Sequence, residues 1–172
     1  MASFSLEHLI KGTKIKRRPG CSLFDINDFE NKTGFALPAE LREFYLQTDG
    51  IFYERPAQKK RSVPLVLSLA RQGEDYQELV EMNDYYVGLI GVNIADFGIL
   101  PITPLIDADP FCVICKGKFL GKIIRLWHDD TPTLEFGGIN SFLLSLFEIG
   151  EAGEWEIDNI RSELGRVRIN IE

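Results

Sequence analysis

The sequence contains few cysteines and no long apolar run, and both absences exclude classes of protein. Its three cysteines, Cys21, Cys112 and Cys115, are an odd number, and no apolar signal-peptide core follows Met1. A disulfide-linked extracellular framework is therefore not expected, and we expect a cytoplasmic protein. No apolar stretch approaches the roughly 20 residues that are needed to cross a bilayer, which excludes an integral membrane protein.

Basic residues are also scarce. Nineteen Lys and Arg stand against 26 Asp and Glu, which gives a net charge of −7. A protein that neutralises phosphates needs clustered bases, so nucleic acid is a poor candidate ligand. The bases gather at residues 11–18 and 55–61, which we expect to be loops, and the rest of the chain is more acidic than the total suggests. An acidic surface suits a basic protein partner such as a nuclease.

The chain is long enough for one packed domain. It has 172 residues, of which 45% are hydrophobic, and it includes twelve Phe. This size and composition predict a single domain with its own core. We expect residues 1–20 to form a basic N-terminal segment, either a short helix followed by a loop or a loosely held arm, and residues 21–172 to form the domain. The oligomeric state is left open.

Capping residues and apolar spacing predict several helices. Asp25 is expected to cap a short helix that Gly34 ends. A second helix is expected to have Pro38 in its first turn and to close at residues 49–50. A third is expected at about residues 74–84, and a fourth is expected to open at residues 140–141 and to end at Gly150.

Other segments have the composition or the alternation of strands. The expected strands are residues 63–67, 86–92, 100–102, 111–115, 122–127 and 167–171. A hairpin loop is expected at residues 54–62. Gly117 and Gly121 lack the Gly-Lys-Ser/Thr ending of a phosphate-binding loop, so this segment is expected to be the turn of a second hairpin.

The order of these elements along the chain resembles that of a known superfamily. In residues 24–50 a short acidic helix is followed by Leu37-Pro38 and by a helix that closes on Asp49-Gly50. Residues 99–102 are followed by an acidic turn at 107–110, the second hairpin, the turn at 128–130 and a helix at 141–143. Together these segments cover about half of the chain. In this order they resemble the SUKH superfamily, in particular its Smi/Knr-like branch.

The resemblance implies an α+β fold in which a central, mostly antiparallel sheet is flanked by helices, with no catalytic chemistry and no cofactor. Many bacterial relatives are immunity proteins that bind a cognate toxin, often a nuclease or deaminase of a contact-dependent or polymorphic toxin system. Fungal relatives are regulatory scaffold proteins of the cell wall. Both functions are hypotheses for this chain.

One group of side chains suggests chemistry. His128, Asp129 and Asp130, with Asp107 and Asp109 upstream, gather an imidazole and carboxylates beside strand ends, which would suit a metal-dependent hydrolase. The competing interpretation is that these residues cap turns. The Cys112-Val113-Ile114-Cys115 spacing would place its two thiols on opposite faces of a strand, which disfavours joint metal binding.

The candidate partner-binding residues are acidic or aromatic, with one histidine. Acids suit a basic partner, and large aromatics are frequent at binding hot spots. They are Glu74, Asp75, Glu78, Glu81, Asp107, Asp109, Trp127, His128, Asp129, Asp130, Glu151, Glu154 and Trp155.

Overall fold

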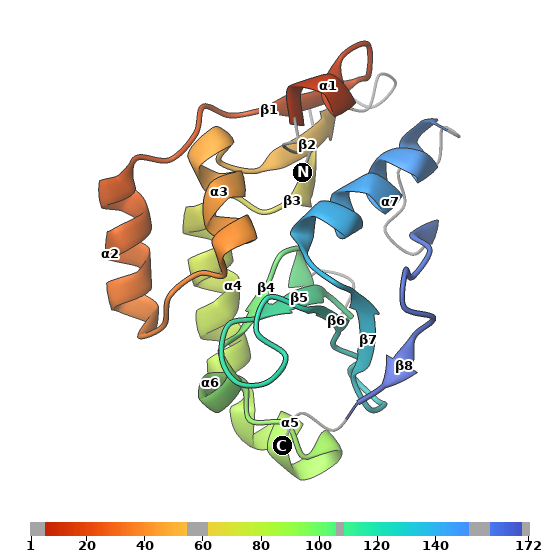
Figure 1. Ribbon diagram of the computed structural model, residues 1–172. Helices are drawn as coiled ribbons and strands as arrows, with labels where there is room; N and C mark the ends of the chain where they lie inside the picture. The colour runs from red at the N-terminus through yellow and green to blue at the C-terminus, as the bar shows by residue number, and fades with distance from the viewer. Residues whose placement is uncertain (1–5, 55–61, 106–108, 152–158, 170–172) are drawn as a thin grey trace.

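Two antiparallel sheets and the helices around them make up the fold of the protein, seen in a computed structural model (Figure 1). The structure describes residues 6–54, 62–105, 109–151 and 159–169. The first sheet has the order β1-β2-β3, with β1 (Ile15–Arg17), β2 (Ile51–Glu54) and β3 (Ser62–Val66). The second has the order β4-β5-β6-β7-β8, with β4 (Ile99–Pro101), β5 (Phe111–Ile114), β6 (Ile123–Arg125), β7 (Thr133–Phe136) and β8 (Val167–Arg168). The predicted α+β class is confirmed.

The helices lie around these sheets. They are α1 (Leu6–Ile10), α2 (Leu23–Thr33), α3 (Ala39–Gln47), α4 (Leu69–Glu81), α5 (Asn83–Ile90), α6 (Ile94–Phe97) and α7 (Ile139–Glu151). Helix α4 packs on β4 and α7 packs on β7. Within the described residues, no helix is both long and apolar enough to span a membrane.

The start of α2 differs from the prediction by one turn. Ser22 is the N-cap, and its hydroxyl accepts a hydrogen bond from the Asp25 backbone N–H while the Asp25 carboxylate accepts from the Ser22 backbone N–H. Asp25 is therefore the third helical residue of a capping box and not the cap itself. The predicted end is confirmed, because Gly34 adopts the left-handed conformation at φ 78°.

The region from residue 68 to residue 91 holds the largest correction. Helix α4 begins at Leu69 with Ser68 as its N-cap, five residues before the predicted start, and it ends at Glu81. Residues 86–92 were predicted as a strand, which is wrong, because α5 covers Asn83–Ile90 and Gly91 ends it in a left-handed conformation. A short apolar run with aromatic and branched residues fits a strand or a buried helix equally well, so periodicity alone does not separate them.

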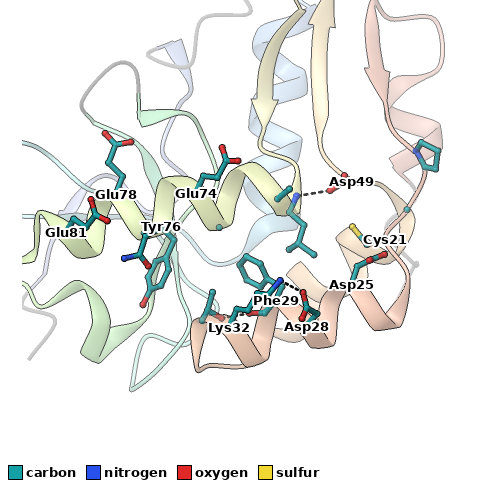
Figure 2. Close-up of a pocket in the computed structure, with 17 residues that line it drawn as sticks. Cys21, Asp25, Asp28, Phe29, Lys32, Asp49, Glu74, Tyr76, Glu78 and Glu81 are labelled. Atoms are coloured by element: carbon teal, nitrogen blue, oxygen red, sulfur yellow. Dashed lines mark hydrogen bonds and ion pairs between the residues drawn. The ribbon is translucent and has the colours of Figure 1, made fainter.

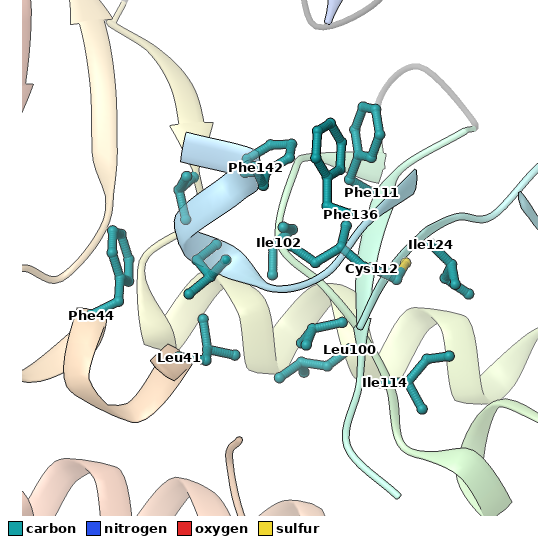
Figure 3. Packing of buried hydrophobic residues seen from close by; sticks show 14 of the residues in the cluster. Leu41, Phe44, Leu100, Ile102, Phe111, Cys112, Ile114, Ile124, Phe136 and Phe142 are labelled. Carbon is teal, nitrogen blue, oxygen red and sulfur yellow. The ribbon is translucent and has the colours of Figure 1, made fainter. Parts of the chain in front are cut away.

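The core lies between the five-stranded sheet, α3 and α7. Phe111 of β5, Phe136 of β7 and Phe142 of α7 form a buried trio whose ring centroids lie 5.3 to 6.0 Å apart (Figure 3). Leu41 and Phe44 of α3 reach the same core from the other side. Each buried aromatic ring removes a large apolar area from water, and this burial is the main stabilising term of the fold.

The predicted β5–β6 hairpin is confirmed. Strands β5 and β6 pair antiparallel, with Cys112 opposite Ile124, and the turn between them contains Gly117 and Gly121. The expected strand at residues 63–67 and the one at 100–102 also appear, as β3 and β4. Strand β2 is an element that the sequence did not indicate.

The two ends of the chain add one strand to each sheet. Strand β8 pairs with β7, which confirms part of the predicted final strand. Strand β1 pairs with β2 and lies inside the first basic cluster, so the prediction that this cluster is a loop is wrong. Backbone pairing with β2 outweighs the poor strand propensity of Lys16. The second basic cluster and the tip of the expected hairpin loop, residues 55–61, lie outside the described residues.

Candidate functional site: an acidic groove between two helices

A groove of about 1100 Å³ runs between α2 and α4 (Figure 2). The two helices lie side by side and run in the same direction. Among the residues that the structure describes, six carboxylates and one ammonium group, that of Lys32, line the groove. The carboxylates belong to Asp25, Asp28, Asp49, Glu74, Glu78 and Glu81. We call this feature the acidic groove.

The α4 wall carries three of the predicted partner-binding residues. Glu74, Glu78 and Glu81 are exposed, and they follow one another at i, i+4 and i+7, which places them on one stripe of the helix. Glu74 lies 3.1 Å from the guanidinium of Arg71. Within the described part of the chain, no base pairs with Glu78 or Glu81. No basic side chain among the described residues therefore offsets the charge of these two carboxylates.

The α2 wall adds two carboxylates that sequence reasoning missed. Asp25 accepts hydrogen bonds from the hydroxyl and the backbone N–H of Ser22, at 2.6 and 3.1 Å, and these bonds lower its pKa. Asp28 lies 2.6 Å from the Lys32 ammonium, one turn further along. The spacing of Asp25 and Asp28 was visible in the sequence, but no local pattern indicated that α2 lies beside α4.

The floor of the groove contains the apolar side chain of Phe29. Phe29 of α2 is buried beneath Gly73 of α4, and a side chain at Gly73 would lie 3.4 Å from the Phe29 ring. At one end, the Asp49 carboxylate accepts a hydrogen bond of 2.7 Å from the Leu69 backbone N–H and so helps to start α4. The neighbouring Cys21 thiol has its pKa raised to about 12, first by burial and then by the charge of Asp49, so it stays protonated at neutral pH.

Asp75 was predicted on the exposed acidic face, and this is wrong. The residue is completely buried, on the same side of α4 as Gln72 and Leu79. Its carboxylate lies 2.7 Å from Arg71 Nε, and Gln72 donates a hydrogen bond of 2.9 Å to the Pro101 carbonyl. Burial raises the pKa of Asp75, while the charge of Arg71 and a hydrogen bond from the Leu105 backbone oppose this rise. The hydrogen bond from Gln72 therefore holds α4 against β4, and Asp75 is buried at the same contact.

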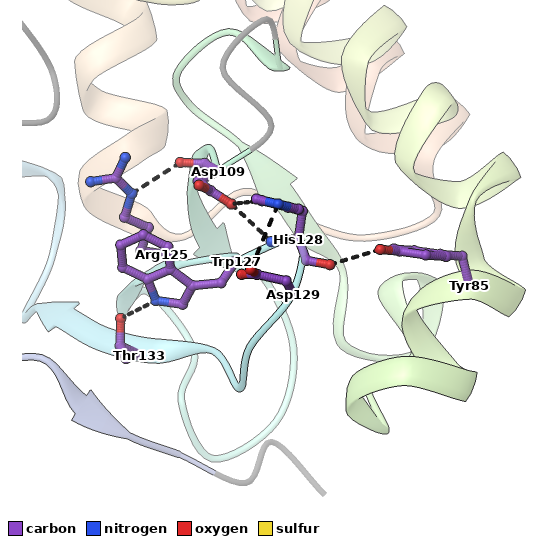
Figure 4. A network of polar contacts seen from close by, with 7 residues as sticks. All are labelled: Tyr85, Asp109, Arg125, Trp127, His128, Asp129 and Thr133. Atoms are coloured by element: carbon purple, nitrogen blue, oxygen red, sulfur yellow. Dashed lines mark hydrogen bonds and ion pairs between the residues drawn. The ribbon is translucent and has the colours of Figure 1, made fainter.

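A second cluster joins Asp109, His128 and Tyr85 (Figure 4). One oxygen of Asp109 lies 2.8 Å from both the backbone nitrogen and the ring Nδ1 of His128. Tyr85 of α5 donates a hydrogen bond of 2.8 Å to the His128 carbonyl. The hydrogen bond and charge of Asp109 raise the pKa of His128. This geometry fixes the turn after β6 to α5, as the turn-capping interpretation expects.

Trp127 is half-buried beside this cluster. Its indole N–H donates a hydrogen bond of 2.9 Å to the Thr133 hydroxyl, and its ring lies 4.6 Å from the guanidinium of Arg125. Arg125 is itself buried, lies over the Phe111 ring and donates to the Asp109 carbonyl. The Trp127 ring is therefore held in place by a cation–π contact and a hydrogen bond.

The predicted partner-binding residues thus fall into two described groups. Glu74, Glu78 and Glu81 line the acidic groove, whereas Asp109, Trp127, His128 and Asp129 lie together near the turn after β6. Asp130 pairs with Arg168 at 2.8 Å. Asp107, Glu154 and Trp155 lie outside the described residues, as does the side chain of Glu151.

The cysteines and the carboxylates give little support to a metal centre. Cys112 and Cys115 are free and buried, and burial raises the pKa of both thiols, which keeps them in the protonated form that binds metals poorly. Among residues 6–54, 62–105, 109–151 and 159–169, no three His, Cys, Asp or Glu side chains are placed to share a metal ion.

Comparison with known families decides the classification. A profile of the SMI1/KNR4 family (SUKH-1) matches residues 20–145, which is most of the chain. The chain belongs to the SMI1/KNR4 family (SUKH-1). No curated protein matches it. The SUKH-1 region contains α2 and α4, and so both walls of the acidic groove, and it also contains the Asp109–His128 cluster. Strands β1 and β8 lie outside the matched SUKH-1 region.

Proposed function

We propose that this SUKH-1 protein is a non-catalytic protein-binding module that acts as an immunity protein. In this proposal it binds and neutralises a cognate toxin of nuclease or deaminase type, which belongs to a contact-dependent or polymorphic toxin system and is encoded nearby. The observation that carries the proposal is the acidic groove, a large concave surface with six carboxylates, within the part of the chain that matches the family.

Charge gives the physical reason for this choice of partner. A nuclease holds phosphate groups with Lys and Arg side chains, so its substrate-binding surface is positive. An acidic groove attracts such a surface and raises the rate of association, while it repels nucleic acid itself. The bound protein would then cover the toxin's active site or a surface near it. This mechanism needs no catalytic group and no cofactor, and we place it in the cytoplasm.

Co-expression with the adjacent gene product tests the proposal. The effector encoded next to this gene is expressed from an inducible promoter, with and without this protein, and growth and complex formation are measured. We expect growth to be restored and the two proteins to elute as one complex. An effector that is neither bound nor neutralised contradicts the immunity role. Binding to a cellular protein without neutralisation would instead support a regulatory scaffold, like that of the fungal relatives.

A further inference from the structure

The shape of the acidic groove restricts what can occupy it. Its walls are two helices of 11 and 13 residues, so the longer wall extends about 20 Å. Between their first and last turns, helices use their backbone N–H and C=O groups internally. Beyond their first turns, the walls therefore offer only side chains to a ligand. An extended peptide would find no strand edge here to pair with, whereas a helix satisfies its own backbone.

The spacing of the carboxylates agrees with a helical occupant. Glu81 lies seven residues after Glu74 in α4, with Glu78 between them, and this separation corresponds to about 10 Å along the helix axis. A second helix that carries bases at i, i+4 and i+7 repeats the same distances. The Lys32 ammonium lies 2.6 Å from Asp28 and offsets part of the charge of the α2 wall. Glu78 and Glu81 therefore supply much of the attraction.

Two apolar side chains are exposed at the start of α2, which forms one wall of the acidic groove. Leu23 and Phe24, in the first turn of α2, are 57% and 78% exposed. Phe24 lies one turn before the groove residue Asp28, on the same side of the helix. An exposed aromatic side chain next to a concave charged surface is a common anchor for a partner. The occupant thus needs apolar as well as basic side chains.

We infer that the acidic groove binds an amphipathic α-helix of the partner protein, with Lys or Arg at i, i+4 and i+7 and apolar residues beside them that contact Phe24. The inference rests on the proposed function, because it names the part of the partner that is recognised. It assigns binding to the α2–α4 face and not to the Asp109–His128 cluster.

A designed peptide tests this inference without knowledge of the toxin. The probe is an 18-residue Ala-rich helix with Lys at i, i+4 and i+7 and Leu beside them, and its control is a scrambled peptide of the same composition. Binding to the full chain is measured by calorimetry in 50 mM and 500 mM salt. We expect the helix to bind at least about tenfold more tightly than the scrambled peptide, and to bind more weakly in high salt.

Charge-neutral variants then locate the binding surface. Glu78→Gln/Glu81→Gln should weaken binding of the helix about tenfold, because two unpartnered carboxylates lose their charge. The matched control is Glu43→Gln/Glu148→Gln, which removes two exposed carboxylates outside the groove and should change the affinity less than about twofold. Equal binding of the scrambled peptide, no effect of the groove variant, or an equal effect of the control overturns the inference.

The two proposals fail in different ways. If the adjacent effector is neutralised but the groove variant binds the helical peptide as the wild type does, the helix-in-groove inference is wrong and the immunity role stands. If the helical peptide binds in the groove but the effector is neither bound nor neutralised, the immunity role is wrong and the groove remains a helix-binding site.

Discussion

Gly73 stands within α4, where glycine costs about 0.5–1 kcal/mol relative to alanine. The Cβ of an alanine there would lie 3.4 and 3.8 Å from two atoms of the Phe29 ring, which is ordinary van der Waals contact. Gly73→Ala should therefore gain helix propensity without a clash. We expect a stabilisation of about 0.5–1 kcal/mol, or about 1–4 °C in Tm for a chain of this length.

Thermal unfolding followed by circular dichroism measures this gain, and α5 supplies the control. Gly88 is exposed within α5, and nothing lies within 4 Å of the Cβ that an alanine would place there. Gly88→Ala should therefore show the propensity gain alone. If Gly88→Ala stabilises the protein and Gly73→Ala destabilises it, then Phe29 does not leave the space that we describe, and our account of the groove floor is wrong.

Gly73 also lines the acidic groove, so a larger side chain there tests binding. A longer side chain in Gly73→Gln would extend from the floor into the acidic groove, so it should lower the affinity for the helical peptide severalfold while the protein stays folded. Gly88→Gln should leave the affinity unchanged. A Gly73→Gln variant that is folded and binds the peptide as the wild type does would contradict our placement of the occupant.

Three further predictions concern the core, Asp75 and His128. Phe142→Ala should lower the free energy of unfolding, measured in urea, by about 3–5 kcal/mol. Leu144 lies on the same helix and is 53% exposed, so Leu144→Ala should change it by about 0.5 kcal/mol or less. Equal losses in the two variants would contradict the packing that we describe. The pKa of Asp75 is raised above 3.8 in the folded state, so its contribution to stability falls as the pH rises through 3.8 toward the folded pKa. The free energy of unfolding of the wild type minus that of Asp75→Asn should therefore decrease between about pH 3 and pH 7. A constant difference would refute this. The pKa of His128 is raised above 6.5, so the contribution of His128 to stability is present below pH 6.5 and is lost as the pH rises through the folded pKa. Asp109→Asn should lower the His128 pKa toward 6.5 in an NMR titration. An unchanged pKa would show that Asp109 is not the cause of the rise.

The sequence predicted those parts of the fold that depend on local signals. Gly34 ended α2, and the glycines between β5 and β6 marked a hairpin, because each requires a backbone conformation that few other residues adopt. The family resemblance, which is now confirmed, rested on the order of such signals. Local signals were insufficient at residues 83–90, where an apolar run forms α5 instead of a strand.

The candidate site was predicted only in part, since a site depends on contacts between distant segments. Glu74, Glu78 and Glu81 could be placed on one helix face from their spacing alone. The burial of Asp75 depends on the packing of α4 on β4, and the contribution of Asp25 and Asp28 depends on the packing of α2 beside α4. No local pattern contains this information.

Protection from hydrogen exchange in the complex with the adjacent effector tests the central claim most directly. The claim is that the α2–α4 face is where this SUKH-1 protein binds its partner. Amide exchange is compared between the free protein and the complex. Our account predicts that protection rises in α2 and α4 and stays unchanged around the turn after β6, at residues 127–130. Protection that rises at this turn and in α5, with α2 and α4 unchanged, would contradict it.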